Sequence, residues 1–207
     1  MYFKTLKFVT LTAGLIVSPL ALAGGDAPSL LVGTCISCHG PSGSSVGPAN
    51  PSIAGIMDTE DFVSSMQDYK NDAVPSTIMG RIARGYSDAD FKAMAEYFGG
   101  QELVRPTQEF DAKKAKKGKK IHNKYCEKKC HEDNGYDNKK GVLAGQWMPY
   151  LEYALADFHD GSRKTAKERE KAGDGKMEKK MKKMLDKEGK AGLESLVHFY
   201  GSQTKSK

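Results

Sequence analysis

Two cysteines and a histidine lie together near the N-terminus, in the string Cys35-Ile36-Ser37-Cys38-His39. On a helical turn, residues three positions apart face the same side, so the two sulfurs can bond one flat partner. The adjacent His39 then projects toward a metal at the centre of that partner. This spacing is typical of covalent attachment of a c-type haem, with Cys35 and Cys38 bonded to the porphyrin vinyl groups and His39 bound to the iron.

A second, altered copy of the motif reads CEKKCH at residues 126–131 and uses the other two of the four cysteines. It predicts a second haem attached through Cys126 and Cys130, with His131 on the iron. In a regular helix the extra residue rotates the first sulfur by about 100° around the axis. We therefore expect one of residues 127–129 to bulge out in a single wide turn. A Cys126–Cys130 disulfide and a zinc site shared by all four cysteines are the alternatives.

Each iron bound by a histidine needs a sixth ligand, and a methionine thioether favours the ferrous state and raises the potential. In the first half we predict Met79, which lies 40 residues after His39 and shortly before a terminal helical pattern. In the second half we predict Met181, with a bis-histidine haem as the alternative. The methionines that compete for these roles are Met57, Met66 and Met94 in the first half and Met177 and Met184 in the second.

An internal repeat places the two motifs in equivalent units. Each unit begins with a helical pattern that leads to its cysteines and ends with an amphipathic helical pattern. Residues 79–98 align without a gap on residues 181–200, and the apolar positions coincide, with Phe91 over Leu193. No alternating segment is long enough for a sheet. The sequence therefore predicts an all-α fold of two domains of about 80 residues, each using a haem as much of its core.

The N-terminal residues resemble a secretory signal. Lys4 and Lys7 precede the apolar stretch 8–22, and Ala21 and Ala23 are the small residues of a cleavage site before Gly24. The apolar stretch is shorter than the roughly 20 residues of a membrane span, so we expect an exported, soluble, periplasmic protein, with an uncleaved anchor as the alternative. The predicted boundaries are 1–23 for the signal peptide, 24–100 for the first domain, 101–112 for the linker and 113–207 for the second domain.

Charge is distributed unevenly along the mature chain. Residues 24–105 contain 10 acidic and 5 basic residues, a formal charge of −5, whereas residues 106–207 contain 16 acidic and 25 basic residues, a charge of +9. Two halves of opposite sign can orient a docking partner. The lysine runs lack the interleaved aromatic residues of a stacking platform, which argues against nucleic acid as that partner.

Three histidines and the single tryptophan lie outside the two motifs. We interpret His122, His159 and His198 as surface residues or neighbours of the ligands rather than as ligands. We place His159 in a polar, loop-like stretch and His198 on the last helix, opposite its apolar stripe. Trp147 is interpreted as a core aromatic residue, and the alternative is that its indole N–H reaches a haem propionate.

Over essentially the whole mature chain, the sequence resembles the dihaem cytochrome subunit of flavocytochrome c sulfide dehydrogenase. The resemblance rests on the double unit, on the glycine-rich residues 40–47, on residues 76–88 and most closely on residues 143–151. The chain departs from the family pattern at CEKKCH, where the family has two intervening residues. The resemblance implies two tandem class I cytochrome c-like domains, each with one covalently bound haem c.

The resemblance also implies a division of labour. A separate flavoprotein subunit carrying FAD would oxidise sulfide and pass single electrons to these haems, which relay them to a soluble cytochrome or another acceptor. The present chain has no glycine fingerprint for a dinucleotide and no cysteine left over to attack sulfur, so we expect it not to be an enzyme by itself. A free-standing dihaem shuttle to a terminal oxidase is the alternative, and a peroxidase-like haem enzyme would need an open axial position.

Overall fold

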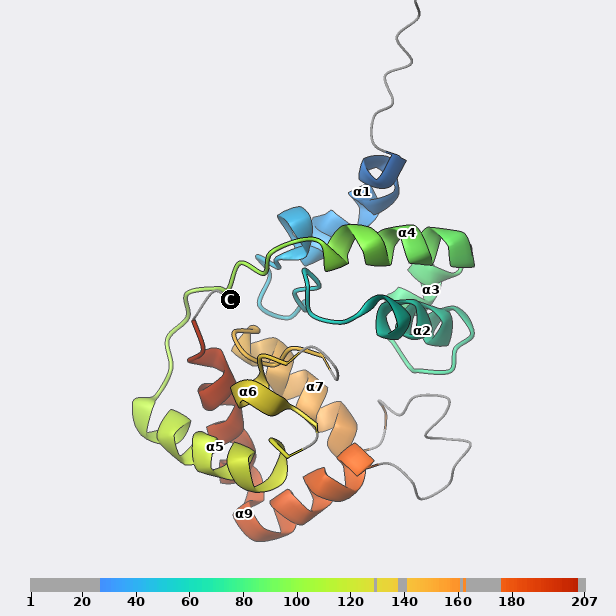
Figure 1. The fold of residues 1–207 in the computed structure, drawn as a ribbon. Coiled ribbons are helices and arrows are strands. Elements are labelled where there is room, and N and C mark those ends of the chain that lie inside the picture. Colours follow the sequence, from blue (N-terminus) through green and yellow to red (C-terminus); the bar gives the residue numbers. More distant parts are fainter. Residues whose placement is uncertain (1–26, 129, 138–140, 161, 163–175, 205–207) are drawn as a thin grey trace, which may run out of the picture.

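The computed structural model describes residues 27–128, 130–137, 141–160, 162 and 176–204. In these residues the chain forms two groups of helices joined by an extended segment (Figure 1), and they contain no β-strand. The predicted all-α fold is confirmed. The predicted signal peptide, residues 1–23, lies outside the described residues. No helix in the described part of the chain has the length and apolar character needed to cross a membrane.

The first group contains four α-helices and one short 3-10 helix. In order, they are α1 (Ala27–His39), η1 (Pro41–Gly43), α2 (Thr59–Lys70), α3 (Met79–Ala83) and α4 (Asp88–Gly99). Helix α4 starts at a capping box, in which Ser87 and Asp90 each satisfy a backbone N–H of the other. Helix α4 packs against α1 and α2. Their apolar faces form the first-domain core, which consists of Val32, Phe62, Met66, Ala83, Phe91, Met94, Ala95 and Phe98.

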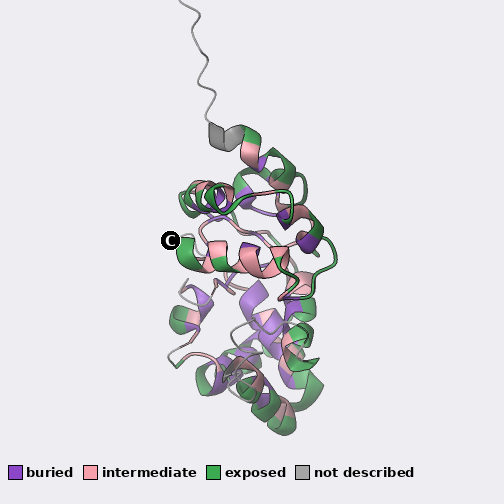
Figure 2. Cartoon of the chain, turned by 90° about the vertical axis from the view of Figure 1, so that its right-hand side faces the viewer, coloured by how far each residue is buried: buried purple, intermediate pink, exposed green. Residues whose placement is uncertain are grey.

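The second group repeats this plan with longer helices. They are α5 (Ala112–Tyr125), α6 (Glu132–Gly135), α7 (Met148–Asp160) and α9 (Lys176–Gly201). Helix α9 bends at Gly189, which has a φ of 63°, so that its second part packs along α5 as α4 packs along α1. The second-domain core consists of Ile121, Tyr125, Leu151, Leu155, Met181, Met184, Leu196, Val197, Phe199 and Tyr200. Figure 2 shows buried residues inside both groups and exposed residues over the outer faces.

The repeat seen in the sequence extends to backbone hydrogen bonds. In the first domain the carbonyl of Gly43 accepts from the N–H groups of Ile53 and Ala54, at 2.6 and 3.1 Å. In the second domain the carbonyl of Gly135 accepts in the same way from Leu143 and Ala144, at 2.9 and 3.0 Å. Each glycine has a positive φ that suits a residue without a Cβ. The two domains therefore fold the loop after their cysteines in the same manner.

In the structure, the segment predicted as a linker is packed against both domains. Residues 101–111 have no regular secondary structure, and α5 begins at Ala112. Arg105 donates from Nε to the carbonyl of Ala144 at 3.2 Å and lies over the ring of Tyr136. Leu103 enters an interdomain cluster. This cluster consists of Ala54, Ile56, Leu103, Tyr136, Val142 and Ala144.

Candidate haem-binding sites

In the first domain the predicted attachment residues lie on the last turn of α1. Cys35, Cys38 and His39 are three of its last five residues, so the helix places them on one turn, as the motif requires. The chain then reverses at Gly40, whose φ is 79°. A Cβ at this position would lie 1.9 Å from the carbonyl oxygen of Ser44. Only glycine fits here, and the reversal brings the following loop back beside His39.

His39 is held in the tautomer that a metal needs. Its Nδ1 lies 2.8 Å from the carbonyl oxygen of Pro51. Because a carbonyl can only accept, Nδ1 carries the hydrogen and Nε2 keeps its lone pair for an iron. Burial lowers the pKa of His39, an effect opposed by the hydrogen bond to Pro51, and so favours the neutral imidazole.

Met79 is the first residue of α3. Both Cys35 and Met79 are partly buried against the first-domain core. Met66 and Met94 lie inside that core, as expected for helix-face residues, whereas Met57 borders both this core and the interdomain cluster. The structure thus brings Met79 to the same apolar surface as Cys35, and its role as the sixth ligand remains our prediction.

The second motif lies beyond the end of its helix. Helix α5 ends at Tyr125, and the N–H of His131 donates to the carbonyl of Cys126 at 3.1 Å, across five residues. A bond across five residues closes a wider turn than the α-helical bond across four, which agrees with the wide turn expected for the extra residue, and the bulge among residues 127–129 remains our prediction. All four cysteines are free thiols, so the structure does not form the alternative Cys126–Cys130 disulfide. Cys35 and Cys126 border two different cores, which speaks against a zinc site shared by all four cysteines.

The second-domain core brings the predicted cysteine and methionine together. Cys126 is partly buried against it, and burial raises the pKa of this thiol to about 11. Met181 and Met184 are 2% and 1% exposed within the core, and Met177 packs at its edge. The three methionines lie four and three residues apart and so share one face of α9. Met181 remains our prediction among them.

The other histidines and the tryptophan differ from expectation in several ways. His122 is fully buried, which excludes the surface position and agrees with the other expected position, beside the second motif. Its Nδ1 lies 2.9 Å from the hydroxyl of Tyr200, and its Nε2 contacts the carboxylate of Glu127, the residue after Cys126. His159 is exposed, but it lies on helix α7 and not in a loop. Trp147 is only partly buried, and its indole N–H donates to the carbonyl of Ser45 in the first domain at 2.8 Å. The indole has a single N–H, so this bond occupies the donor that a hydrogen bond from Trp147 to a haem propionate would need.

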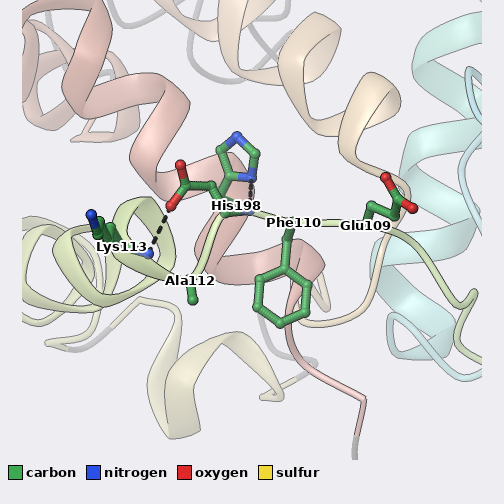
Figure 3. Close-up of a pocket in the computed structure, with 6 residues that line it drawn as sticks. Glu109, Phe110, Ala112, Lys113 and His198 are labelled. Carbon is green, nitrogen blue, oxygen red and sulfur yellow. Dashed lines mark hydrogen bonds between the residues drawn. The ribbon is translucent and has the colours of Figure 1, made fainter.

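His198 contacts the backbone where the linker segment joins α5. Its Nδ1 accepts from the backbone N–H of Asp111 at 3.0 Å. Figure 3 shows this contact in a shallow pocket beside Phe110. The pocket is lined by Glu109, Phe110, Asp111, Ala112, Lys113 and His198. None of the predicted haem-binding residues lines this pocket, and the contact of His198 is with the backbone that precedes α5.

Sequence reasoning missed the residues that orient the predicted ligands. The carbonyl of Pro51, which lies beside His39 Nδ1, is the example, because it belongs to no recognisable motif. One signal was present: Ile53-Ala54-Gly55 after the first motif recurs as Leu143-Ala144-Gly145 after the second. A loop that recurs after both motifs has a common task, and in the first domain that task includes the hydrogen bond to His39.

The first site fits a covalently attached haem. Its thiols are free, the His39 Nε2 lone pair is available, and Cys35 and Met79 border one apolar core. The second site offers free thiols beside a core that contains candidate methionines. A haem c supplies a reversible one-electron couple when bound. The residues of the chain would hold its plane and exclude water from it.

The fold and the first site define a cytochrome that transfers electrons. Residues 28–100 match the cytochrome c family. The chain is 39% identical over 83 residues to the cytochrome subunit of sulfide dehydrogenase from Chlorobaculum tepidum, a match that covers 40% of this chain and 71% of that protein. This chain belongs to the cytochrome c family.

Two further comparisons extend over both domains. Cytochrome c4 from Azotobacter vinelandii is 29% identical over 179 residues, which cover 77% of this chain and 84% of that protein. The crystal structure of reduced recombinant cytochrome c4 from Pseudomonas stutzeri superposes with a TM-score of 0.68 at 25% identity, covering 86% of this chain and 97% of that one. The chain thus has the fold of two tandem cytochrome c domains.

Proposed function

We propose that this chain is a periplasmic dihaem electron-transfer subunit that accepts electrons from an FAD-containing subunit oxidising sulfide. It passes them to a soluble cytochrome or another acceptor. In this proposal Cys35 and Cys38 attach the first haem, and His39 and Met79 bind its iron. Cys126 and Cys130 attach the second haem, and its iron is bound by His131 and Met181.

The repeated loop is the observation that supports two haems rather than one. The carbonyls of Gly43 and Gly135 each accept hydrogen bonds from two successive N–H groups, at equivalent places after a Cys–His pair. The loop that lies beside the predicted ligand His39 in the first domain thus recurs after His131 in the second. If each iron were bound by a histidine and a methionine of this chain, as proposed, no coordination position would be left for substrate, and the bound haems would supply outer-sphere electron transfer. The chain by itself would therefore not oxidise sulfide.

The resemblance to the cytochrome subunit of sulfide dehydrogenases supports the choice of a flavoprotein donor, and the Chlorobaculum tepidum relative agrees with it at 39% identity. The charge distribution suits docking: α5 contains seven lysines and no acidic residue. Exposed lysines of this helix are Lys113, Lys116, Lys117, Lys119, Lys120 and Lys124. An acidic surface on a partner would be attracted to this helix.

The alternative is a free-standing dihaem shuttle to a terminal oxidase. It is favoured by the comparisons that span both domains, because the cytochrome c4 proteins are not named as subunits of a dehydrogenase. Both functions use the same haem sites. They differ in whether a flavin subunit binds this chain.

The number of haems is tested by the mass of the exported protein. We expect two added macrocycles, with the signal peptide removed. The double variant Cys126→Ala/Cys130→Ala should lose one macrocycle, and its matched control Cys35→Ala/Cys38→Ala should lose the other. A wild-type protein that carries a single macrocycle, unaffected by the substitution of Cys126 and Cys130, would contradict the dihaem proposal.

The donor is tested by purifying the native protein and measuring flavin alongside the visible haem spectrum. We expect a flavoprotein to co-purify, and we expect sulfide to reduce the haems rapidly only when that subunit is present. The rate should saturate when the two subunits are equimolar. A haem protein that purifies without flavin and whose reduction by sulfide is unchanged by the flavoprotein would favour the shuttle instead.

A further inference from the structure

A buried glutamine of the second domain binds the backbone of the first. Gln146 is 1% exposed. Its Oε1 accepts from the N–H of Ser52 at 3.0 Å, and its Nε2 donates to the carbonyl of Ser52, also at 3.0 Å. The amide thus pairs with both backbone groups of one residue, as a neighbouring strand would. Ser52 is itself fully buried, so this pairing is shielded from water.

The peptide group that Gln146 binds is the one that orients His39. The N–H of Ser52 and the carbonyl of Pro51 belong to a single planar peptide unit. The carbonyl oxygen lies 2.8 Å from His39 Nδ1, while the N–H is bound by Gln146 on its other side. A continuous chain of hydrogen bonds therefore runs from the predicted iron ligand, through one peptide group, to a side chain of the other domain. Bonds in such a chain polarise one another.

Neighbouring contacts fix the same loop of the first domain from the same side. The indole of Trp147 donates to the carbonyl of Ser45, and the N–H of Tyr150 donates to the carbonyl of Pro48 at 3.0 Å. Ser45 is in turn tied to the loop, because its N–H donates to the Ser52 hydroxyl at 3.0 Å. The loop that carries the acceptor for His39 is thus held by the second domain on both sides of Pro51.

We propose that the second domain sets the reduction potential of the first-domain haem through Gln146, a positioning residue that acts on His39 by way of the Pro51–Ser52 peptide group. A carbonyl that accepts from a ligating histidine makes the imidazole a more basic ligand and so stabilises the ferric iron. Gln146, by accepting from the same peptide group, strengthens that carbonyl as an acceptor. Loss of the Gln146 amide therefore raises the potential of the first haem.

The equivalent contact in the second domain has a different chemistry. The N–H of Val142, which corresponds to that of Ser52 in the repeat, donates to the backbone carbonyl of Ile56 in the first domain at 2.9 Å. Each domain thus reaches the equivalent peptide group of the other. The contact with Ser52 uses a side chain, that of Gln146, whereas the contact with Val142 uses a backbone carbonyl. A substitution at Gln146 therefore removes the contact beside the first haem and leaves the bond between Val142 and Ile56 in place.

The test is the potential of each haem in Gln146→Leu, a variant of similar size without the amide. Redox titration is followed by NMR, with the shifted haem methyl signals assigned to each domain. We expect the first-domain haem to move to a higher potential with altered methyl shifts, while the second-domain haem stays within error of wild type. If Gln146→Leu does not fold, Gln146→Met provides the same test, because its flexible side chain fills an irregular space.

Gln108→Leu is the matched control. Gln108 is an amide at the same junction, but it bonds to the Gln146 carbonyl and the Met148 N–H and not to the loop of the first domain. It should leave the first-haem potential unchanged. The proposal is overturned if Gln146→Leu or Gln146→Met shifts neither haem, shifts both equally or shifts only the second, or if Gln108→Leu shifts the first haem as much. No sulfide or flavoprotein enters these measurements, so their outcome is independent of the proposed donor.

Discussion

The same glycine-to-alanine substitution should have opposite effects in the equivalent helices α1 and α5. Gly118 of α5 lies where this helix crosses α9. A Cβ on Gly118 would meet the Ser195 carbonyl oxygen at 1.9 Å and the Phe199 Cβ at 2.7 Å. Gly33 of α1 has no atom within 4 Å of such a Cβ. The two positions therefore separate helix propensity from packing.

The magnitudes follow from these distances. Ordinary contact begins at 3.4 Å, so α5 and α9 must part by about 1.5 Å to admit the methyl group of Gly118→Ala. The obstacle is a backbone carbonyl, which cannot rotate away, and overpacking of this kind costs about 3 kcal/mol at the upper end of its usual range. The higher helix propensity of alanine offsets about 1 kcal/mol of this loss in the free energy of unfolding. We expect Gly118→Ala to destabilise the second domain by about 2 kcal/mol net, and Gly33→Ala to stabilise the first by about 1 kcal/mol.

Hydrogen exchange measured by mass spectrometry provides the assay, because it reports each helix separately. Exchange of α5 and α9 should accelerate in Gly118→Ala while that of α1 and α4 is unchanged. In Gly33→Ala, exchange of α1 should slow. If Gly118→Ala protects α5 as well as wild type does, the close crossing of α5 and α9 is wrong. If exchange of α1 accelerates in Gly33→Ala as exchange of α5 does in Gly118→Ala, alanine does not stabilise α1 in the way that helix propensity predicts.

Three further predictions concern the ligands, the buried histidine and the basic helix. Met79→Ala should let added imidazole bind the first-domain iron and should lower the reduction potential of that haem, because the thioether ligand is lost. Met57→Ala should leave this iron inaccessible to imidazole. Equal imidazole binding by the two variants in visible spectra would contradict the assignment of Met79. Burial lowers the pKa of His122, so the unfolded chain takes up this proton more readily than the folded one. The free energy of unfolding should therefore fall as the pH drops below 6.5 toward the lowered pKa of His122. The midpoint of urea unfolding should depend less on pH in His122→Gln than in wild type. If the midpoints of the two proteins change in parallel with pH, His122 is not the cause. Lys116→Glu/Lys117→Glu should slow reduction by an acidic partner about 10-fold at low ionic strength in stopped-flow measurements, with a smaller difference at high salt. The exposed Lys92 of the first domain supplies the control, and an equal slowing by Lys92→Glu would show that net charge matters rather than the α5 surface.

Much of the architecture could be predicted from local sequence. Helices α4 and α9 follow from apolar residues at three- and four-residue steps, since such spacing produces one buried face. The cysteine motif of α1 also depends only on local spacing. The wide turn at the second motif was predictable for the same reason, because one inserted residue must be absorbed somewhere between Cys126 and His131.

Other features depended on contacts between distant residues. From the sequence His122 could be a surface residue or a neighbour of a ligand, and only the fold shows that it is buried against Tyr200, 78 positions away. Trp147 looked like a core residue, but its partner is a carbonyl of the other domain. Such pairings depend on how two folded domains meet, and no periodicity within either segment encodes that arrangement.

The sequence by itself determined the chemistry available to this protein: thiols and histidines at fixed short spacings, two repeated units and two halves of opposite charge. The tertiary structure alone decided how the ligands are oriented and how the domains influence each other. The reason is physical. Spacing along a helix fixes which side chains share a turn, whereas the hydrogen bond from His39 to Pro51, and from there to Gln146, forms only after the chain has folded back and the two domains have docked.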